Sequence, residues 1–188
     1  SVANSTSITN DNYGDVDTDF SPSAGLGVAY DSNIGKDKLF NYRLGLEYMT
    51  AKIDTTDSPY KEDFARFNIV NTFGFGVLRT EKVRLWVGPR VNIAWNWRND
   101  DPYDYTEAAL ELGIAPAVGV NVNLSPVVSL GADLDYRFAY VAGAWTNDLD
   151  DDSYDGSANG LTARFYVLFR FGETFNRPAS QSAVDSSL

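Results

Sequence analysis

The chain has 188 residues, a net charge of −11, an aromatic content of 14%, and neither cysteine nor histidine. Without cysteine there is no disulfide scaffold and no thiol nucleophile, and without histidine the commonest general base is missing. Ser-His-Asp and Cys-His catalysis are therefore excluded, and we expect a protein that is not an enzyme. The negative charge argues against nucleic-acid binding. No apolar run reaches the 18 or more residues of a membrane-spanning helix.

Apolar and polar residues alternate through most of the chain, and a period of two is typical of β-strands. Residues 1–9 are expected to form the first strand, or the surviving end of one, and the polar residues 10–23 a long loop. Further strands are expected over residues 24–31, 39–53, 64–79, 83–97, 107–123, 127–145 and 160–171. Short turns at 32–38, 80–82 and 124–126 alternate with long acidic loops at 54–63, 98–106 and 146–159.

Short turns at one end and long loops at the other are typical of outer-membrane barrels. We therefore predict an all-β fold, an up-and-down antiparallel transmembrane β-barrel of about eight strands, with short periplasmic turns and long acidic extracellular loops. The count is even only if residues 1–9 contribute a strand, so a missing or truncated first strand is the open alternative. Residues 1–171 would form the barrel, and residues 172–188 a polar periplasmic tail or linker.

Alternation alone does not say which face of the sheet meets lipid, because a soluble ligand-binding β-barrel would alternate as well. The membrane interpretation is favoured because mid-strand cations are arginines, whereas all five lysines lie at strand ends, turns or loops. Glycines share the arginine face and leave room for long side chains. Aromatic residues near strand ends on the apolar face are the candidate interfacial girdle: Tyr30, Phe40, Tyr48, Trp95, Trp97, Tyr140 and Phe171.

The charged face is expected to form an enclosed network, because guanidinium groups make fixed bidentate pairs with carboxylates. Its candidate members are Arg43, Glu47, Arg66, Arg84, Arg90, Glu107, Glu111, Asp133, Asp135, Arg137, Arg164 and Arg170. An eight-stranded barrel is wide enough only for its own side chains, so a salt-bridged plug is the first interpretation and a narrow ion path the second. We expect Asp133 and Asp135 to be ion-paired rather than catalytic.

The acidic stretch from Asn147 to Gly156 is the one candidate metal site. Asp148, Asp150 and Asp152 have the spacing that opens a calcium loop, although the expected glycine and the late glutamate are missing. A weak calcium or magnesium site and a solvated, self-repelling loop are the two alternatives. The acidic loops together would make a negative rim, able to bridge to anionic lipid through divalent cations or to bind a basic partner.

The final strand ends on Phe169, Arg170 and Phe171, an alternation up to a terminal aromatic residue. With the pattern of residues 1–171, this resembles the small outer-membrane β-barrel superfamily, the OmpA/OmpX-type barrels. Two features depart from that family: Tyr166 stands where glycine is usual, and 17 residues follow Phe171. The resemblance implies the bacterial outer membrane as location and membrane lipid as partner, with another envelope or surface protein as a further candidate for the loops or tail.

The function predicted from the sequence is that of a non-enzymatic outer-membrane barrel with a charge-filled lumen and acidic loops, in a structural or surface-interaction role. The first alternative is a small porin-like channel for an ion or solute. The second alternative is a soluble ligand-binding β-barrel. No cofactor is expected beyond calcium or magnesium ions at the acidic loops.

Overall fold

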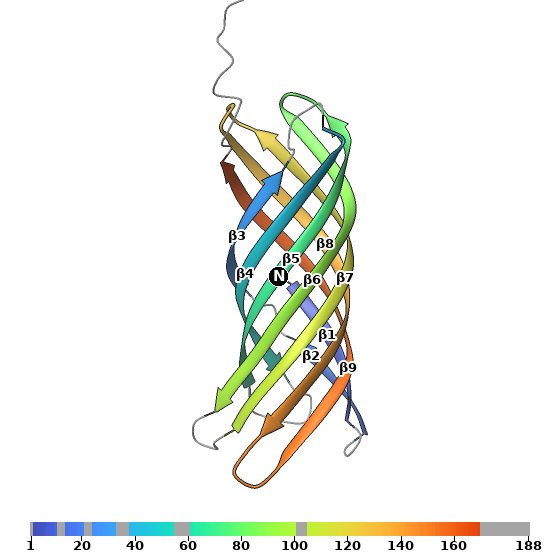
Figure 1. Cartoon of the computed structure of the whole chain (residues 1–188), viewed down its shortest axis with the longest axis vertical. Helices are drawn as coiled ribbons and strands as arrows, with labels where there is room; N and C mark the ends of the chain where they lie inside the picture. The colour runs from blue at the N-terminus through green and yellow to red at the C-terminus, as the bar shows by residue number, and fades with distance from the viewer. Residues whose placement is uncertain are drawn as a thin grey trace, which may run out of the picture.

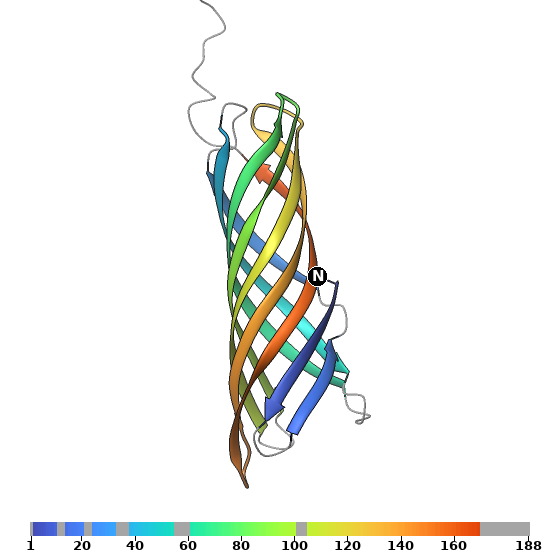
Figure 2. The same ribbon diagram turned by 90° about the vertical axis from the view of Figure 1, so that its right-hand side faces the viewer.

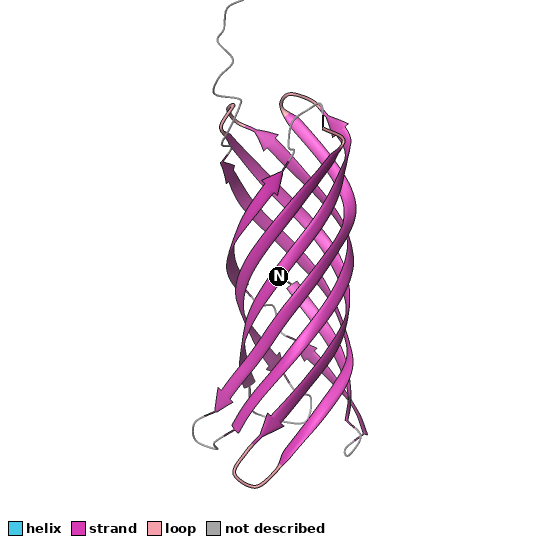
Figure 3. Cartoon of the chain, in the orientation of Figure 1, coloured by secondary structure: helices cyan, strands magenta, loops and turns pink. Residues whose placement is uncertain are grey.

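A computed structural model describes residues 2–10, 14–20, 24–32, 38–54, 61–100 and 105–169, with side chains for residues 24–32, 38–50, 64–99 and 105–169. Strands make up almost all of this part of the chain (Figure 3). The strands are β1 (Val2–Asn10), β2 (Gly14–Phe20), β3 (Ala24–Ser32), β4 (Phe40–Asp54), β5 (Lys61–Arg79), β6 (Val83–Asp100), β7 (Tyr105–Asn123), β8 (Val128–Thr146) and β9 (Asp151–Phe169). None of the described residues forms a helix that is long and apolar enough to cross a membrane.

Strands β3 to β9 form a seven-stranded up-and-down antiparallel sheet in which each strand pairs with the next along the chain. The strands are strongly tilted and the sheet curls around a central axis (Figures 1 and 2). Short turns at residues 80–82 and 124–127 define what we call the upper end, and the turn at residues 147–150 lies at the lower end. The expected all-β, up-and-down antiparallel architecture is confirmed.

The pairings among β3 to β9 do not close the sheet into a barrel. Within the described residues, β3 pairs with β4 and not with β9, so the seven-stranded sheet is not closed on itself. Strand β1 pairs with the lower half of β9, from Val2 opposite Leu161 to Thr9 opposite Asp155. Strand β2 pairs with β1 and touches β4 through two residue pairs at its end. The strand order is therefore β2-β1-β9-β8-β7-β6-β5-β4-β3.

The prediction of two loops is partly wrong. Residues 10–23, predicted as a loop, contain β2, and most of residues 146–159, also predicted as a loop, belong to β9, which begins at Asp151. These segments carry Ser, Asp, Asn and Thr where strands usually carry apolar residues, so hydrophobic alternation does not mark them. Backbone pairing of β1 with β2 and β9 makes them strands nonetheless. Arg170, Phe171 and the tail at 172–188 lie outside the described residues.

Candidate functional site, the charged interior

The sheet buries its charged face and exposes its apolar face. On the concave side Arg90 is 1% exposed and Asp133 is 3% exposed, whereas on the convex side Leu112 is 51% exposed and Ile114 is 64% exposed. Along β7 buried and exposed residues alternate without interruption from Ala109 to Gly119. A water-soluble sheet would show the opposite distribution, because apolar surface is driven out of water and charge is costly to bury.

Arg90, on β6, lies at the centre of the interior. Its Nη1 atom donates to Asp133 Oδ1 at 3.0 Å and also to Asp135, and its Nε atom donates to Thr72 Oγ1 at 2.8 Å. The two carboxylates follow each other at alternate positions of β8, so both point inward from one strand. A guanidinium with several charge-assisted hydrogen bonds is held in a single orientation.

Arg43, on β4, joins the two sides of the curled sheet. It donates to Asp31 on β3, from Nε at 2.9 Å and Nη2 at 2.5 Å, and from Nη1 to Asp133 on β8 at 3.1 Å. Its guanidinium carbon lies 4.2 Å from the centre of the Tyr166 ring on β9. Cation–π contact and ion pairing therefore hold one side chain against three other strands.

Arg164 and Glu47 join β9, one edge of the seven-stranded sheet, to β4, the strand next to the other edge. Arg164 Nε on β9 donates to Glu47 Oε1 on β4 at 2.5 Å, and Nη2 donates to Oε2 at 3.3 Å. Glu47 reaches this position by leaning over Gly27, where a Cβ atom would lie 3.0 Å from Glu47 Cγ. A side chain at residue 27 would therefore push Glu47 away from its arginine.

A second cluster lies below the first and consists of Arg66, Glu111 and Arg137. Arg66 binds Glu111 in a bidentate manner, at 2.6 and 2.8 Å, and Arg137 Nε lies 3.0 Å from Glu111 Oε1. One carboxylate thus serves two guanidinium groups, which leaves this cluster with one excess positive charge.

Each end of the interior is filled by uncharged side chains and one charged side chain. At the upper end Arg84 Nη2 donates to Asn41 Oδ1 at 3.2 Å, beside the fully buried indole of Trp86. At the lower end Glu107 accepts hydrogen bonds from the Tyr154 hydroxyl at 2.5 Å and the Tyr105 hydroxyl at 3.0 Å.

The described interior holds charged side chains of both signs. Six arginines and six carboxylates are buried or ion-paired there: Arg43, Arg66, Arg84, Arg90, Arg137 and Arg164, with Asp31, Glu47, Glu107, Glu111, Asp133 and Asp135. The charges of these twelve described side chains sum to zero. Buried charges that are paired and hydrogen-bonded in this way hold the surrounding strands in one arrangement.

Burial, and next to it the Glu107 carboxylate, raises the pKa of the Tyr154 hydroxyl well above its ordinary value. A raised pKa in the folded state favours the protonated phenol, so this contribution to stability is present below about pH 10 and is lost as the pH rises further. Absorbance at 295 nm near pH 11 counts the tyrosines that ionise only after unfolding in urea, and we expect this number to be smaller by one in Tyr154→Phe than in the native protein. An equal number in the two proteins would contradict the assignment.

The candidate metal ligands are not brought together. Within the described residues no three carboxylates lie close enough to hold a metal ion. The turn at residues 147–150 is instead organised by the Asn147 side chain, whose oxygen accepts from the amides of Leu149 and Asp150, both at 2.8 Å. Asp152 accepts from the amide of Ser153 at 2.8 Å. In this turn Asn147, Asp150 and Asp152 thus act as side chains that hydrogen-bond to nearby backbone amides.

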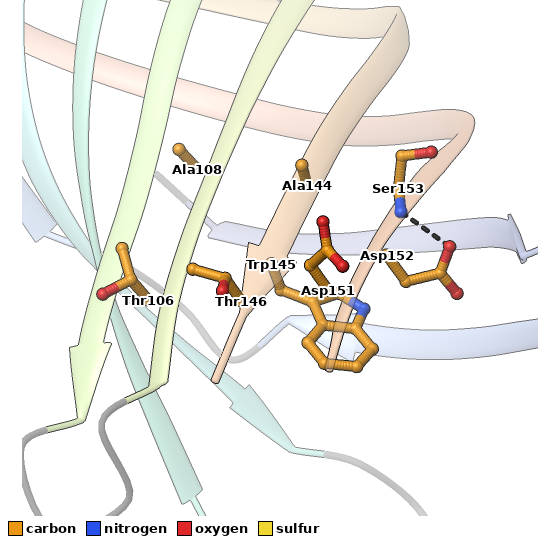
Figure 4. Close-up of a pocket in the computed structure, with 8 residues that line it drawn as sticks. All are labelled: Thr106, Ala108, Ala144, Trp145, Thr146, Asp151, Asp152 and Ser153. Carbon is orange, nitrogen blue, oxygen red and sulfur yellow. Dashed lines mark hydrogen bonds between the residues drawn. The ribbon is translucent and has the colours of Figure 1, made fainter. Parts of the chain in front are cut away.

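An open pocket of about 530 Å³ lies at the lower end over β7, β8 and β9 (Figure 4). Its lining is Thr106, Ala108, Ala144, Trp145, Thr146, Asp151, Asp152 and Ser153. The Trp145 ring stacks on Tyr105 with ring centres 6.0 Å apart, which fixes one wall of the pocket. The pocket is separate from the ion-paired interior, and none of the expected network residues lines it.

The expected girdle residues that the structure describes lie on the convex face. Tyr30, Phe40, Tyr48, Trp95 and Tyr140 are all exposed, and Trp97 is half-buried against Tyr48, with ring centres 6.1 Å apart. Phe171 falls outside the described residues.

Eleven of the twelve expected network residues lie in the interior, and Arg170 is outside the described residues. Sequence reasoning missed Asp31, Tyr154 and Tyr166 as members of the network. Asp31 was recognisable, because it shares the parity of Gly25 and Gly27 on the inward face. Tyr154 was hidden by the wrong assignment of its segment to a loop.

No protein-family model matches the chain, and neither a curated protein nor a solved structure matches it. No family is therefore identified, and the function has to be argued from the sheet and its interior.

Proposed function

We propose that this protein is a non-enzymatic β-barrel of the bacterial outer membrane, whose ion-paired interior is a structural plug and whose lower end meets the cell exterior. The observation that carries the proposal is the inverted sheet, with buried ion pairs on the concave face and exposed apolar side chains on the convex face. Lipid is the surroundings in which such a convex face is stable.

The height of the apolar band supports this proposal. On β7 the outward-facing residues are apolar from Leu110 to Val122, and on β8 they are largely apolar from Val128 to Tyr140. Thirteen strand residues at a tilt of about 45° rise roughly 30 Å, close to the band of about 25 Å that outer-membrane barrels show. Below it, the outward positions of β9 turn polar at Asp155, Ser157 and Asn159.

The pairings of β2 and β3 support closure as an eight-stranded wall. On β4, Ile53 pairs with Phe20 of β2 and Thr50 pairs with Ala24 of β3, so both strands run along the same edge of β4. Counted as one strand, β2 and β3 join β1 and β4 to β9 to make eight, an even number as such barrels require. The Arg164–Glu47 ion pair holds β9 and β4 together from inside.

The plug is favoured over the channel because the ion pairs span the cross-section. Arg43 on β4 and Arg90 on β6 both reach across to Asp133 on β8, and the Trp86 indole is fully buried above them. At the lower end, exposed Asp148, Asp150 and Asp155 would face the exterior, where a basic surface of another envelope protein or divalent cations would complement them.

The experiment is depth-resolved fluorescence quenching in lipid vesicles. The chain has four tryptophans, so variants that retain one of them report one depth each. We expect lipids brominated on their acyl chains to quench Trp95, on the convex face, several-fold more than Trp86, inside, or Trp145, at the lower end. Equal quenching of all three, or protein that stays out of the vesicles, would contradict the membrane barrel.

A conductance measurement on the protein from these vesicles, transferred to a planar bilayer, distinguishes a plug from a channel. Folded, inserted protein in a planar bilayer is expected to give no stable conductance steps at neutral pH. Regular ion-selective steps from the inserted protein would establish the channel in place of the plug.

A further inference from the structure

The second cluster of the interior, formed by Arg66, Glu111 and Arg137 and called the lower cluster from here on, carries more positive than negative charge. Arg66 holds the carboxylate through two hydrogen bonds, and Arg137 Nε approaches the same carboxylate to 3.0 Å. The three side chains are only 3–9% exposed. A buried charge needs a counter-charge, because burial removes its hydration. Two guanidinium groups around one carboxylate leave a charge of +1 without one.

The other carboxylates of the interior have partners of their own. Asp135 accepts hydrogen bonds from Arg90 and Arg164, and Glu47 accepts from Arg164 as well. Glu107 accepts from two tyrosine hydroxyls. Among the described residues, Glu111 is the only carboxylate that forms an ion pair with either arginine of the lower cluster.

Buried hydrogen-bond donors beside the lower cluster lack acceptors. Arg66 Nε and Arg137 Nε donate no hydrogen bond within the part of the chain that the structure describes, and the 3.0 Å contact of Arg137 with Glu111 is an ion pair without hydrogen-bond geometry. Asn92 on β6 turns its amide nitrogen toward Arg137. A Cβ atom at Gly113 would lie 2.9 Å from Asn92 Nδ2 and 3.1 Å from Arg137 Cδ. Buried donors without a protein partner are usually satisfied by water or an ion.

The lower cluster also leaves space beside its guanidinium groups. The side chains of Arg66 and Arg137 are 9% and 8% exposed, compared with 2% for Arg90 in the cluster above. Small residues at neighbouring inward positions, Ala94 on β6 and Ala139 on β8, have no side chain long enough to fill this space. Water would satisfy the donors there, but only an anion would also neutralise the charge.

We propose that the lower cluster binds one small monovalent anion, chloride, between the guanidinium groups of Arg66 and Arg137 and the amide nitrogen of Asn92. A monovalent ion brings the cluster to neutrality. A sulfate or phosphate dianion would instead leave a negative charge in the interior and would lose more hydration on burial. This inference goes beyond the proposed function, because it rests on the contacts inside the sheet and not on what surrounds the convex face.

The test is the dependence of stability on chloride. The native protein, refolded in micelles of a non-ionic detergent, is unfolded with urea at constant ionic strength, with sodium chloride replacing sodium gluconate, whose anion is too large for the interior. A ligand that binds only the folded state stabilises it by mass action, so the unfolding equilibrium constant should fall at least ~10-fold at about 0.3 M chloride. Asn92→Asp keeps the side-chain volume and places a carboxylate beside Arg137, so this response should disappear. The matched control is Arg84→Gln, which removes an arginine at the upper end and should keep the response.

A second measurement locates the ion and needs only the native protein. Crystals grown in sodium bromide should show an anomalous-scattering peak within hydrogen-bond distance of the Arg137 and Asn92 side-chain nitrogen atoms. Equal stability of the native protein in chloride and gluconate would overturn the proposal, as would an undiminished chloride response in Asn92→Asp or a crystal without a bromide peak at the lower cluster. Both measurements report on the interior alone, so their failure leaves the quenching experiment in vesicles unaffected. Failure of the protein to enter vesicles likewise leaves the chloride response intact.

Discussion

Asp133→Asn is expected to lower the free energy of unfolding by about 3–5 kcal/mol, because it leaves two buried guanidinium groups without their shared counter-ion. The Asp133 side chain is fully buried, with Oδ1 3.0 Å from Arg90 and Oδ2 3.1 Å from Arg43. Asparagine keeps the volume but removes the charge and half of the acceptor capacity. Arg90 stays in place in the variant, since Thr72 accepts from its Nε atom and Asp135 accepts from the same Nη1 atom that binds Asp133.

The measurement is urea unfolding of the refolded protein in detergent micelles, followed by tryptophan fluorescence. Asp148→Asn makes the same chemical change at an exposed position and is expected to stay within about 0.5 kcal/mol of the native protein. Equal stability of the two variants would show that Asp133 is not part of an ion-paired network.

Gly119→Ala is expected to cost about 1–3 kcal/mol through overpacking, although alanine normally improves a strand. A Cβ atom at Gly119 would lie 2.5 Å from Cε2 and 2.7 Å from Nε1 of Trp86, closer than real atoms approach. On the other side of the indole, a Cβ atom at Gly74 would lie 3.3 Å from Cε3, itself a tight contact. The Trp86 ring therefore occupies space that glycines leave on both neighbouring strands.

Gly45→Ala is the matched control, also on an inward-facing strand position. Its nearest contact would be Val70 Cβ at 3.6 Å, an ordinary van der Waals distance. Alanine there should stabilise the protein by about 0.5–1 kcal/mol, because it removes the entropic cost of glycine in a strand. The two variants are thus expected to shift the urea midpoint in opposite directions. A shift of the same sign in both would show that Trp86 does not fill the interior as described.

The period of two was sufficient to place seven strands and to separate the charged from the apolar face. It works for strands such as β7, where burial alternates as strictly as hydrophobicity does. It fails for β2 and for the lower half of β9, because their residues are polar on both faces. Pairing with β1 makes them strands, and a non-local backbone contact leaves no local pattern.

The sequence also identified the arginines and most carboxylates of the interior, but not which arginine pairs with which carboxylate. Arg43 meets Asp133, 90 residues away, because of the tilt of the strands and the curl of the sheet. Neither quantity can be deduced from alternation along a single strand. Likewise, Tyr166 is unexpected where glycine is usual, yet its ring receives the Arg43 guanidinium and its hydroxyl donates to Asn121 at 3.1 Å.

The length of the ion-pair connections has a consequence for the order of assembly. Arg43 binds Asp133, which lies 90 residues downstream, and Glu47 binds Arg164, which lies 117 residues downstream. A nascent sheet of β3 to β7 therefore contains Arg43 and Arg90 without their β8 carboxylates, and such a sheet cannot bury them at low cost. Only β8 and β9 bring Asp133, Asp135 and Arg164 into the interior. The chain should therefore fold as a single slow cooperative unit in which partly assembled sheets do not accumulate.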